Sequence, residues 1–463
     1  MSDLNAIDRY LQQTQPSQLE LLNRLLRIPS ISADPAYSGS VREAADTLVE
    51  IFRELGLQAE LIETDGPPLV YAETPAVPGR PVVLVYGHYD VQPPDPLELW
   101  ETPPFEPTIR DGKIYARGAT DDKGQMLTHV LSVSAWLATG QSLPVQIKFL
   151  IEGEEEVGSE QLEAYLQRPE AADKLACDVV VISDSTQYGP DQPAITYGLR
   201  GIAYFEIHCF GPNQDLHSGS FGGAVANPAT QLCRLLSQMI DDSGRIQIPG
   251  FYDAVRPLEE SERQNWARLE FDDAEFAAQI GVEELFGEAG YTTLERRWAR
   301  PTFDIHGLWG GYAGEGGKTI ITARAGAKFS FRLVPDQTPE QVAEQVRAFV
   351  DSHRPPGVRL ELIDLHGGPG VVVDPNSPFI AAAQEAITAA FGKPAVLIRE
   401  GGSIPIVASF VQRLGADVLL LGWGQDDDGA HSPNEKLNLE DFYRGTRASS
   451  RLWDTLARVA SSA

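Results

Sequence analysis

Cysteine is scarce in this sequence. Cys177, Cys209 and Cys233 are the three cysteines among 463 residues, and no two of them form a C-x-x-C pair. Three thiols at these spacings do not predict a disulfide framework. We expect all three to be buried apolar side chains, and their small number favours a reducing compartment, which points to the cytoplasm.

Long apolar runs and an excess of basic residues are also missing. No window approaches about 18 uninterrupted apolar residues, so no membrane-spanning helix is expected. The first residues, Met-Ser-Asp-Leu-Asn-Ala-Ile-Asp, predict no secretory signal, because they lack a cationic head and an apolar stretch. The chain has 66 acidic and 37 basic residues and a formal net charge of −29. This balance argues against a nucleic-acid partner, since few cations would neutralise a phosphate backbone.

The first part of the chain alternates helix and strand patterns. Apolar residues recur with helical spacing over 19–26 and 41–55, and a further helix is expected over 123–138. Strong apolar runs predict strands at 82–86, 145–152 and 178–183. This alternation is typical of an α/β fold, with a mostly parallel sheet and helices on both faces.

A change of pattern near residue 200 predicts an inserted domain. A strand over 203–210, a helix that begins at Asn227-Pro228, an alternating strand over 328–333, a helix from Pro339 and a strand over 358–362 indicate a small α+β layer. Residues 245–318 are rich in Gly, Pro, charge and Trp and predict no particular element. We therefore expect a main domain over 1–199 and 381–463, with a smaller domain over 200–380 inserted in it.

The strongest chemical signal follows the strand expected at 82–86, where the sequence reads Gly-His88-Tyr-Asp90. Residues two apart on an extended segment point to the same side. His88 could then bind a metal while Asp90 orients the imidazole and raises its basicity. The alternative is a histidine at a strand edge with a structural aspartate as its neighbour.

Carboxylates recur at the start of the helix expected from 123. Asp121 could be an ordinary N-cap, because aspartate is common at that position. The neighbouring Asp122 can cap the helix instead, which would free Asp121 to bridge two metals.

A denser acidic group, Glu152-Gly-Glu-Glu-Glu156, directly follows an apolar strand. A charge run is usually a solvated face. Four carboxylates crowded at a buried strand end would, however, repel each other strongly without cations. One of them can bind a metal while its neighbour takes a proton from a bound water.

Other polar motifs lie further along the chain. Asp184 follows the strand expected at 178–183, and His431 lies in a polar loop after the last strong strand. His217, in Asp-Leu-His-Ser-Gly, lies in the expected inserted domain and carries little information alone. Residues 399–405, Arg-Glu-Gly-Gly-Ser-Ile-Pro, place exposed backbone N–H groups at an expected helix start, where they could hold a carboxylate.

These motifs share a place in the expected fold. The strand ends of an α/β sheet meet at one edge, and sites form there. Imidazoles and carboxylates that meet at such an edge can hold a pair of divalent metals. The sequence therefore predicts a hydrolase that uses a metal-activated water.

Three competing motifs fail. Gly317-Lys-Thr lacks the first glycine of a P-loop, because Tyr312 stands at its position. Gly422-Trp-Gly424 lacks the third glycine of a dinucleotide fingerprint, because Asp427 stands there. Neither H-E-x-x-H nor G-x-S-x-G occurs in the sequence.

Seven blocks together resemble a known family. They are GHYDVQP, GATDDKG, EGEEEVGS, DLHSG, FRLVP, REGGSIP and AHSPNEKL. In this order they are similar to the co-catalytic metallopeptidases that include cytosolic non-specific (carnosinase-like) dipeptidase, aminoacylase, succinyl-diaminopimelate desuccinylase and glutamate carboxypeptidases. The resemblance covers essentially the whole chain and is strongest for the dipeptidase branch. It implies a di-metal catalytic domain with an inserted lid or dimerisation domain.

The resemblance also implies roles for individual residues. His88 and Asp184 would bind one metal, Glu156 and His431 the other, and Asp121 would bridge them. Glu155 would be the general base, and Asp90 would orient His88. His217 would come from the partner subunit of a homodimer and polarise the scissile carbonyl. Arg332 would hold the carboxylate of the substrate, with further substrate contacts from Ser403, Gly402, His366 and Thr319.

One residue departs from the dipeptidase pattern. Glu154 stands where these dipeptidases usually carry an apolar residue, so an extra carboxylate beside the site could alter metal affinity or substrate preference.

The sequence thus predicts a cytoplasmic, homodimeric metallo-dipeptidase that binds neither nucleic acid nor membrane. It would use two divalent ions, Zn²⁺ or Mn²⁺, with Co²⁺ as a third candidate. An N-acyl-amino-acid amidohydrolase (a deacylase or desuccinylase) uses the same chemistry and is the nearest alternative. A metal-binding scaffold without catalysis is the alternative from another class.

Overall fold

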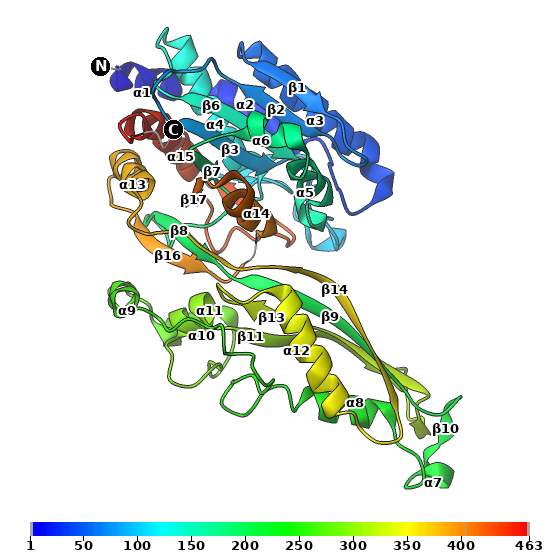
Figure 1. Cartoon of the computed structure of the whole chain (residues 1–463). Coiled ribbons are helices and arrows are strands. Elements are labelled where there is room, and N and C mark those ends of the chain that lie inside the picture. The colour runs from blue at the N-terminus through cyan, green and yellow to red at the C-terminus, as the bar shows by residue number, and fades with distance from the viewer. Residues whose placement is uncertain (1–2, 403, 461–463) are drawn as a thin grey trace. The chain divides into compact units, whose positions relative to one another are not determined.

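The computed structural model describes residues 3–402 and 404–460, except for the side chain of Pro405 (Figure 1). The chain forms two compact units. Unit 1 contains Met1–Tyr197, Val373–Ile398 and Ser409–Ala463, and unit 2 contains Gly198–Val372 and Arg399–Ala408. Compared with the expected domains, the division falls after Tyr197 and Val372, and the segment Arg399–Ala408 belongs with the second unit.

Most strands of one mixed sheet belong to unit 1, and β15 and the ends of β8 and β16 belong to unit 2. Within the described residues its strands run in the order β1 (Gln58–Ile62), β2 (Leu69–Glu73), β6 (Gln146–Glu152), β3 (Val82–His88), β7 (Val179–Ile182), β17 (Asp417–Leu421), β8 (Ala194–Leu199) and β15 (Val371–Val372), and β16 (Val396–Glu400) also pairs with β8. The central strands β6, β3, β7 and β17 are parallel. Antiparallel strands flank them on both sides. The predicted α/β fold is confirmed, with its parallel pairing at the centre of the sheet.

Helices cover both faces of this sheet because its central strands are apolar on both sides. On one face, Phe149 of β6 packs against Phe52 of α3 (Ser38–Glu54), with ring centroids 4.9 Å apart. Helix α4 (Lys123–Ala138) lies on the same side, where a Cβ on Gly87 would meet Met126. On the other face, the ring of Tyr86 meets Phe410 of α14 (Pro405–Leu414) at 5.2 Å.

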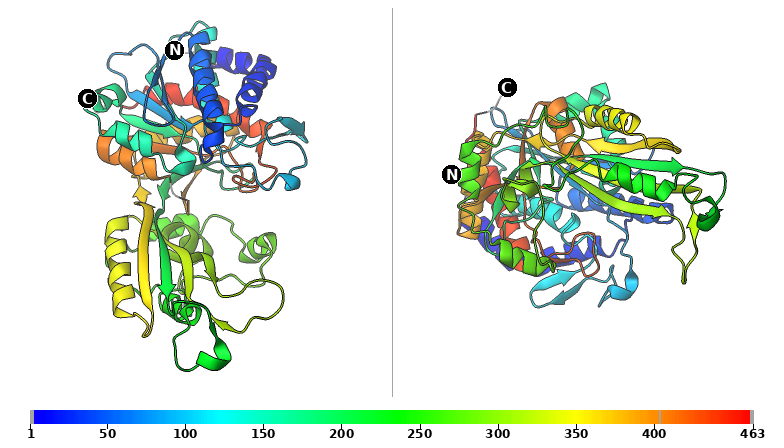
Figure 2. Two further views of the ribbon diagram at one scale, coloured as in Figure 1. Left: turned by 90° about the vertical axis from the view of Figure 1, so that its right-hand side faces the viewer. Right: turned by 90° about the horizontal axis from the view of Figure 1, so that it is seen from below.

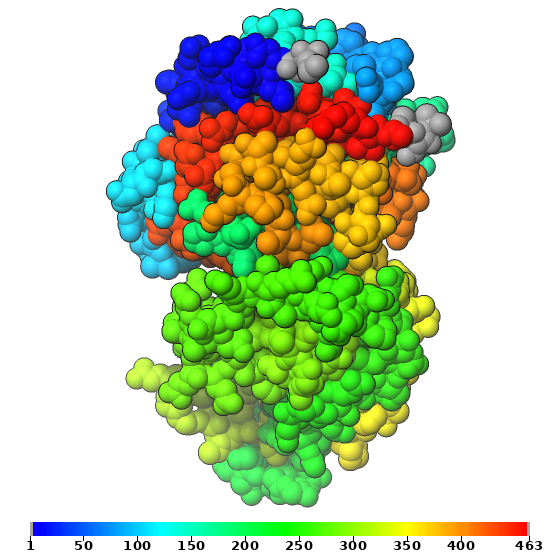
Figure 3. Space-filling model, turned by 90° about the vertical axis from the view of Figure 1, so that its left-hand side faces the viewer, coloured from blue at the N-terminus to red at the C-terminus, as the bar shows by residue number. Residues whose placement is uncertain are grey.

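The remaining helices of unit 1 pack on α4, on α15 or on the sheet, or are short. They are α1 (Leu4–Gln13), α2 (Gln15–Leu26), α5 (Glu160–Leu166), α6 (Pro169–Leu175), α13 (Pro378–Phe391) and α15 (Leu439–Leu456), with single turns η1 (Pro35–Tyr37), η2 (Leu97–Leu99) and η3 (Glu155–Val157). Helices α13 and α15 lie side by side at the surface, drawn in orange and red in Figure 3. Helix α4 packs between β3 and helices α2 and α15, so it is buried almost all round.

A small antiparallel sheet joins two distant parts of unit 1. Its strands are β18 (Lys436–Asn438), β5 (Lys113–Tyr115) and β4 (Thr108–Arg110). Lys436 pairs with Tyr115. The loop that follows β5 and the loop that precedes β18 are therefore brought together.

Unit 2 contains a four-stranded antiparallel sheet in the order β11 (Thr302–Gly310), β13 (Arg324–Leu333), β9 (Gly201–Phe210) and β14 (Arg359–Gly368). Helices α8 (Pro228–Leu236) and α12 (Pro339–Ser352) cover one face, as Figure 2 shows for the yellow α12. Alternate residues of β9, among them Phe205 and Ile207, point into that core. This is the predicted α+β layer.

Residues 245–318 contain three short helices that the sequence pattern did not reveal. They are α9 (Glu260–Trp266), α10 (Asp273–Ile280) and α11 (Thr293–Ala299). Helix α11 begins with a capping box: the N–H of Glu295 donates to Thr292 Oγ1, and the N–H of Thr292 donates to the Glu295 carboxylate. Trp266 and Trp298 pack edge to face at 5.3 Å. Both tryptophan rings are buried, so packing between segments, rather than helical periodicity, stabilises these helices.

The cysteines and the helices bear on two sequence expectations. The thiols are free; Cys209 is buried, Cys177 is half-buried and Cys233 is exposed. The expectation of buried thiols is therefore wrong for Cys233, which lies on the solvent side of the short helix α8. In the described part of the chain, no helix combines the length and apolarity needed to cross a membrane.

Candidate metal centre

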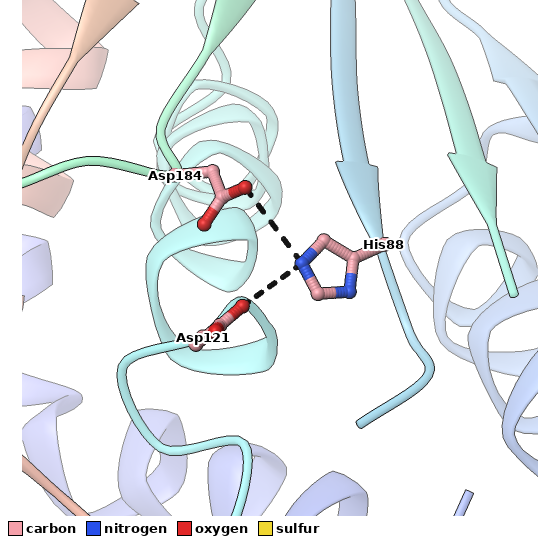
Figure 4. Close-up of side chains that lie close together, drawn as sticks. All are labelled: His88, Asp121 and Asp184. Carbon is pink, nitrogen blue, oxygen red and sulfur yellow. Dashed lines mark ion pairs between the residues drawn. The ribbon is translucent and has the colours of Figure 1, made fainter. Parts of the chain in front are cut away.

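His88 lies at the carboxyl end of β3 with two carboxylates in front of its ring. Its Nε2 is 3.1 Å from Asp121 Oδ1 and 3.8 Å from Asp184 Oδ2. Figure 4 shows both carboxylates directed at the same imidazole nitrogen. Asp184 follows β7, the neighbour of β3 in the sheet, and Asp121 precedes α4. Parallel strands end at one edge, so the sheet itself places His88 beside Asp184.

Asp90 lies behind the same imidazole. Its Oδ1 is 3.4 Å from His88 Nδ1, and its backbone oxygen is 3.2 Å from that nitrogen. The buried carboxylate also accepts hydrogen bonds from Ser32 Oγ at 2.6 Å and from the N–H groups of Glu155 and Glu156 at 3.2 Å. Asp90 therefore ties the orientation of His88 to the turn that carries the two glutamates.

A second group forms around His431. Its Nε2 lies 2.9 Å from Asp121 Oδ2 and 3.2 Å from Glu156 Oε2. The backbone of His431 has φ 61°, in the left-handed region that a histidine seldom adopts. Glu156 is held by Gln92, whose N–H and side-chain amide donate to its carboxylate at 3.1 and 2.8 Å.

The two groups share Asp121 and suit metal ions. In the described residues, His88, Asp121 and Asp184 form one set, and Asp121, Glu156 and His431 form the other; within each set, one ligand atom per residue lies within 4.8 Å of the others. His88 Nε2 is buried and has no aligned hydrogen bond, although Asp121 is close. A buried imidazole nitrogen that faces carboxylates is well placed to bind a metal ion. One imidazole with carboxylates in each set fits a divalent metal ion.

Electrostatics in the protein alone lead to the same conclusion. Burial lowers the pKa of His88, but the Asp121 and Asp90 carboxylates outweigh this effect and hold that pKa well above its ordinary value. Interactions with Asp121 and Glu156 raise the pKa of His431 to about 10. Burial raises the pKa of Asp121, but His431 and His88 reverse this and lower it. The carboxylates thus attract cationic charge at both positions, which a metal can supply in place of a proton.

Glu155 lies beside these groups and belongs to neither of them. It begins the single turn η3, next to Glu156. Burial raises the pKa of Glu155 well above its usual range, and the positive charge of His88 opposes that shift. A carboxyl group with a raised pKa beside two candidate metal groups is suited to accept and release a proton.

Three other acidic residues near these groups make contacts that the sequence did not predict, and the expected cap by Asp122 is wrong. Asp122 stands at the N-cap position of α4, but its side chain makes no capping hydrogen bond; it accepts the N–H of His88 at 3.3 Å. Glu152 is turned into the protein, where it accepts the hydroxyl groups of Tyr86 and Ser159 at 2.7 and 2.8 Å. Glu154 accepts the N–H of Gln161 at the start of α5. Glu152 and Glu154 therefore each have a donor within the protein, and neither belongs to the two candidate metal groups.

The candidate substrate residues lie in unit 2, at opposite ends of its sheet. His217 and Thr319 lie beyond the end formed by Phe210, where β10 (Leu216–His217) pairs with β12 (Ile320–Ile321), next to the short helix α7 (Ser218–Phe221) (Figure 1). His217 is exposed, and its Nδ1 accepts the N–H of Gly219 at 3.0 Å. Within unit 2, His217 and Thr319 therefore lie apart from Arg332 and His366.

Arg332 and His366 lie at the other end of the sheet. His366 stacks on Tyr204, with ring centroids 5.0 Å apart. Burial lowers the pKa of His366, and the charge of Arg332 adds to this effect. Gly402 is exposed in the loop before α14, and Ser403 lies outside the described residues.

Two further residues were missed by the sequence argument. Arg200 donates to the carbonyl oxygens of Gly401 and Arg300, both at 3.2 Å, and burial together with the charge of Arg332 lowers its pKa to about 10. Glu435 is fully buried and contacts the loop that carries Asp121. In the sequence, Glu435 is marked by its place in the AHSPNEKL block, shortly after His431.

Comparisons with known proteins identify the family of this chain. The model of peptidase family M20/M25/M40 matches residues 84–455. The Cys-Gly metallodipeptidase DUG1 of Candida albicans is 37% identical over 457 residues, which cover 94% of this chain and 94% of that protein. The Beta-Ala-His dipeptidase of Homo sapiens is 35% identical over 464 residues, covering 96% and 91%.

A solved structure extends the likeness to three dimensions. The di-peptidase Dug1p from Saccharomyces cerevisiae matches with a TM-score of 0.86 and 34% sequence identity, covering 99% of this chain and 100% of that one. Because the family model spans most of the sequence and these relatives cover nearly all of it, this protein belongs to peptidase family M20/M25/M40.

Proposed function

We propose that this protein is a metal-dependent exopeptidase that hydrolyses dipeptides or other short peptides. The observation that carries the proposal is the pair of imidazole–carboxylate groups that share Asp121. The names of its relatives, a Cys-Gly metallodipeptidase and a Beta-Ala-His dipeptidase, support the substrate class.

Two divalent ions, Zn²⁺ or Mn²⁺ with Co²⁺ as a third candidate, would be held at these groups. His88 and Asp184 would hold one ion, Glu156 and His431 would hold the other, and Asp121 would contribute to both. When bound, the ions supply Lewis acidity and lower the pKa of a coordinated water. Asp90 keeps the His88 ring in position through the contacts at its Nδ1.

Glu155 acts as the general base in this proposal. Its carboxylate accepts the proton of the attacking water and returns it to the departing amine. Its place beside the ligands, rather than among them, supports this role.

Substrate recognition is assigned to unit 2 and to a homodimer. The Arg332 guanidinium would pair with the substrate carboxylate, with further contacts from His366, Gly402 and Ser403. His217 would polarise the scissile carbonyl in the active site of the partner subunit, and Thr319 would be a further substrate contact. The separation of His217 from Arg332, at opposite ends of one sheet, supports contributions from two chains. Unit 1 would be the catalytic domain and unit 2 the lid and dimerisation domain of a cytoplasmic enzyme.

A substrate panel tests the proposal. Metal-free protein is reloaded with Zn²⁺, Mn²⁺ or Co²⁺ and assayed on Cys-Gly, β-Ala-His and Ala-Ala, and on N-acetyl and N-succinyl amino acids. We expect turnover of free dipeptides with at least one metal and none without it. Turnover confined to the acylated amino acids would make the protein an amidohydrolase. Metal binding without turnover of any of these compounds would favour a scaffold.

A further inference from the structure

The Glu435 carboxylate accepts hydrogen bonds from four donors of the loop before α4. Its Oε1 accepts the N–H groups of Thr120 and Asp121 at 2.9 and 3.1 Å. Its Oε2 accepts the N–H of Gly118 at 2.9 Å and Nη1 of Arg117 at 2.8 Å. The Glu435 side chain is fully buried, so water does not replace these contacts. One carboxylate thus sets the backbone course of the residues that lead to Asp121.

The loop that contains Glu435 also contains His431, and a second side-chain contact joins this loop to the loop before α4. The hydroxyl group of Thr120, the residue before Asp121, donates to Asp428 Oδ2 at 3.1 Å. Asp428 lies three residues before His431. The N–H of Ala116 donates to the backbone oxygen of Glu435 at 3.1 Å, which continues the pairing of β5 with β18. The His431 loop is therefore attached to the Asp121 loop on both sides of the histidine.

We propose that Glu435 is a positioning residue of the metal centre: it presets the backbone of Asp121 and holds the His431 loop against it. Both candidate metal groups depend on this arrangement, because Asp121 belongs to both and His431 to one. A carboxylate suits the role, since its two oxygens can accept from four donors at once, whereas an amide offers a single acceptor oxygen. The inference rests on the proposed function, since it assumes that the two groups hold metal ions.

Glu435→Gln tests this role against a merely structural one. The amide nitrogen would face backbone N–H groups and push the loop away, so we expect the affinity for each metal to fall by about 10–100-fold. Affinities of the metal-free protein for Zn²⁺ and Mn²⁺ are measured by competition with a chromophoric chelator, and the visible spectrum of the Co²⁺ form reports the ligand geometry. The matched control is Asp427→Asn, in the same loop, whose side chain is 64% exposed and pairs with Lys436. We expect the control to bind metals as the wild type does.

The outcomes separate the two roles. An unfolding temperature that falls while metal affinity and the Co²⁺ spectrum of the folded variant stay as in the wild type would overturn the inference. A wild-type protein that binds neither ion would overturn the proposed function itself, independently of any variant.

A second measurement needs no variant. In metal-free wild-type protein, the amide hydrogens of Gly118, Thr120 and Asp121 should exchange slowly with deuterium, because Glu435 holds them before metal arrives. If Glu435→Gln fails to fold, this experiment still decides. Exchange at the rate of an open loop would show that the backbone is not preset, and the inference would be wrong.

Discussion

Acidic residues a few positions apart in this chain do different work because they contact different partners. Asp90 accepts hydrogen bonds from a serine hydroxyl and two backbone N–H groups, which hold its carboxylate behind His88. Glu152 receives two hydroxyl groups at one oxygen, and its other oxygen is buried with no partner. A carboxyl group in that setting favours its protonated form. Residue type alone does not separate these roles; the donors around each group do.

Glu155→Gln should abolish turnover while metal content is kept. The amide cannot accept a proton from water, and Glu155 lies outside both ligand groups. We expect kcat to fall by about 10²–10⁴-fold or more. Steady-state kinetics with the dipeptide that the wild type turns over, together with elemental analysis of the purified variant, checks this. Activity near that of the wild type, with both metals bound, would remove Glu155 from the role of general base.

Glu152→Gln should change how stability depends on pH. Burial raises the pKa of Glu152 to about 8, although the hydrogen bond from Tyr86 opposes this. The unfolded chain has the ordinary value of about 4.3, so between these values the folded protein binds more protons than the unfolded chain. The stability of the wild type should therefore fall as pH rises through this window, by up to about 1.4 kcal/mol per pH unit from this group.

The glutamine variant mimics the protonated form and lacks that contribution, so it should gain stability relative to the wild type from pH 5 to pH 8. Denaturant unfolding of the two metal-free proteins across this range measures the difference. Glu170→Gln, at an exposed position of α6, is the control. A difference in stability that does not change with pH would contradict the prediction.

Elements that the sequence predicted well are those whose local pattern and tertiary role agree. Strands β3, β6 and β7 are continuous apolar runs because both of their faces are covered. Helix α8 begins at Pro228 as predicted, since Asn227 caps it through the N–H of Ala229. Strands such as β10, β12 and β15 were missed because two paired residues leave no periodicity.

For the candidate site, the sequence indicated which segments would meet but not how neighbouring side chains would turn. The strand ends placed His88 near Asp184 through the sheet alone. Asp122 was expected to cap α4, and Glu152 and Glu154 were counted in one acidic cluster. Asp122 instead accepts the N–H of His88, Glu152 accepts the hydroxyl group of Tyr86, and Glu154 accepts the N–H of Gln161. Such choices depend on donors supplied by distant segments, which no local pattern reveals.

Glu154 gives a prediction at the level of helix α5. Ser159 stands at the N-cap position but donates its hydroxyl to Glu152, so it caps nothing; Glu154 accepts the N–H of Gln161 instead. Glu154→Ala should therefore destabilise the protein by about 1 kcal/mol, the usual cost of a lost cap. Glu154→Gln, which keeps an acceptor oxygen, should lose less.

Both variants should keep the metal affinity of the wild type, because this carboxylate is already engaged at the helix. Denaturant unfolding and chelator competition measure the two quantities. A changed metal affinity with unchanged stability would instead support the expectation that Glu154 tunes the metal site.

At the scale of the whole molecule, the chain divides its candidate chemistry between two units. The metal groups belong to unit 1, whereas His217, Thr319, Arg332 and His366 belong to unit 2. The chain leaves unit 1 at β8 and re-enters it after β15, and both strands pair at the edge of the same sheet. An insertion at this place leaves the strand ends that carry the candidate metal ligands uninterrupted.

The homodimer proposal predicts rescue between two inactive variants. If His217 serves the partner's site and Glu155 serves its own, then a mixed dimer of His217→Ala and Glu155→Gln has one site with both defects and one with neither. Each variant alone should be inactive, and the mixed dimer should recover about half of the wild-type activity per dimer. Co-expression with two different affinity tags and sequential purification isolates it.

The two homodimers, purified in the same way, are the controls, and light scattering at the assay concentration establishes the oligomeric state. An inactive mixed dimer would mean that His217 acts within its own chain or takes no part. A monomer with full activity would contradict the arrangement more directly, since a single chain would then suffice. His217 at one end of the unit 2 sheet and Arg332 at the other make recovery the expected result, because one substrate would need residues from both ends.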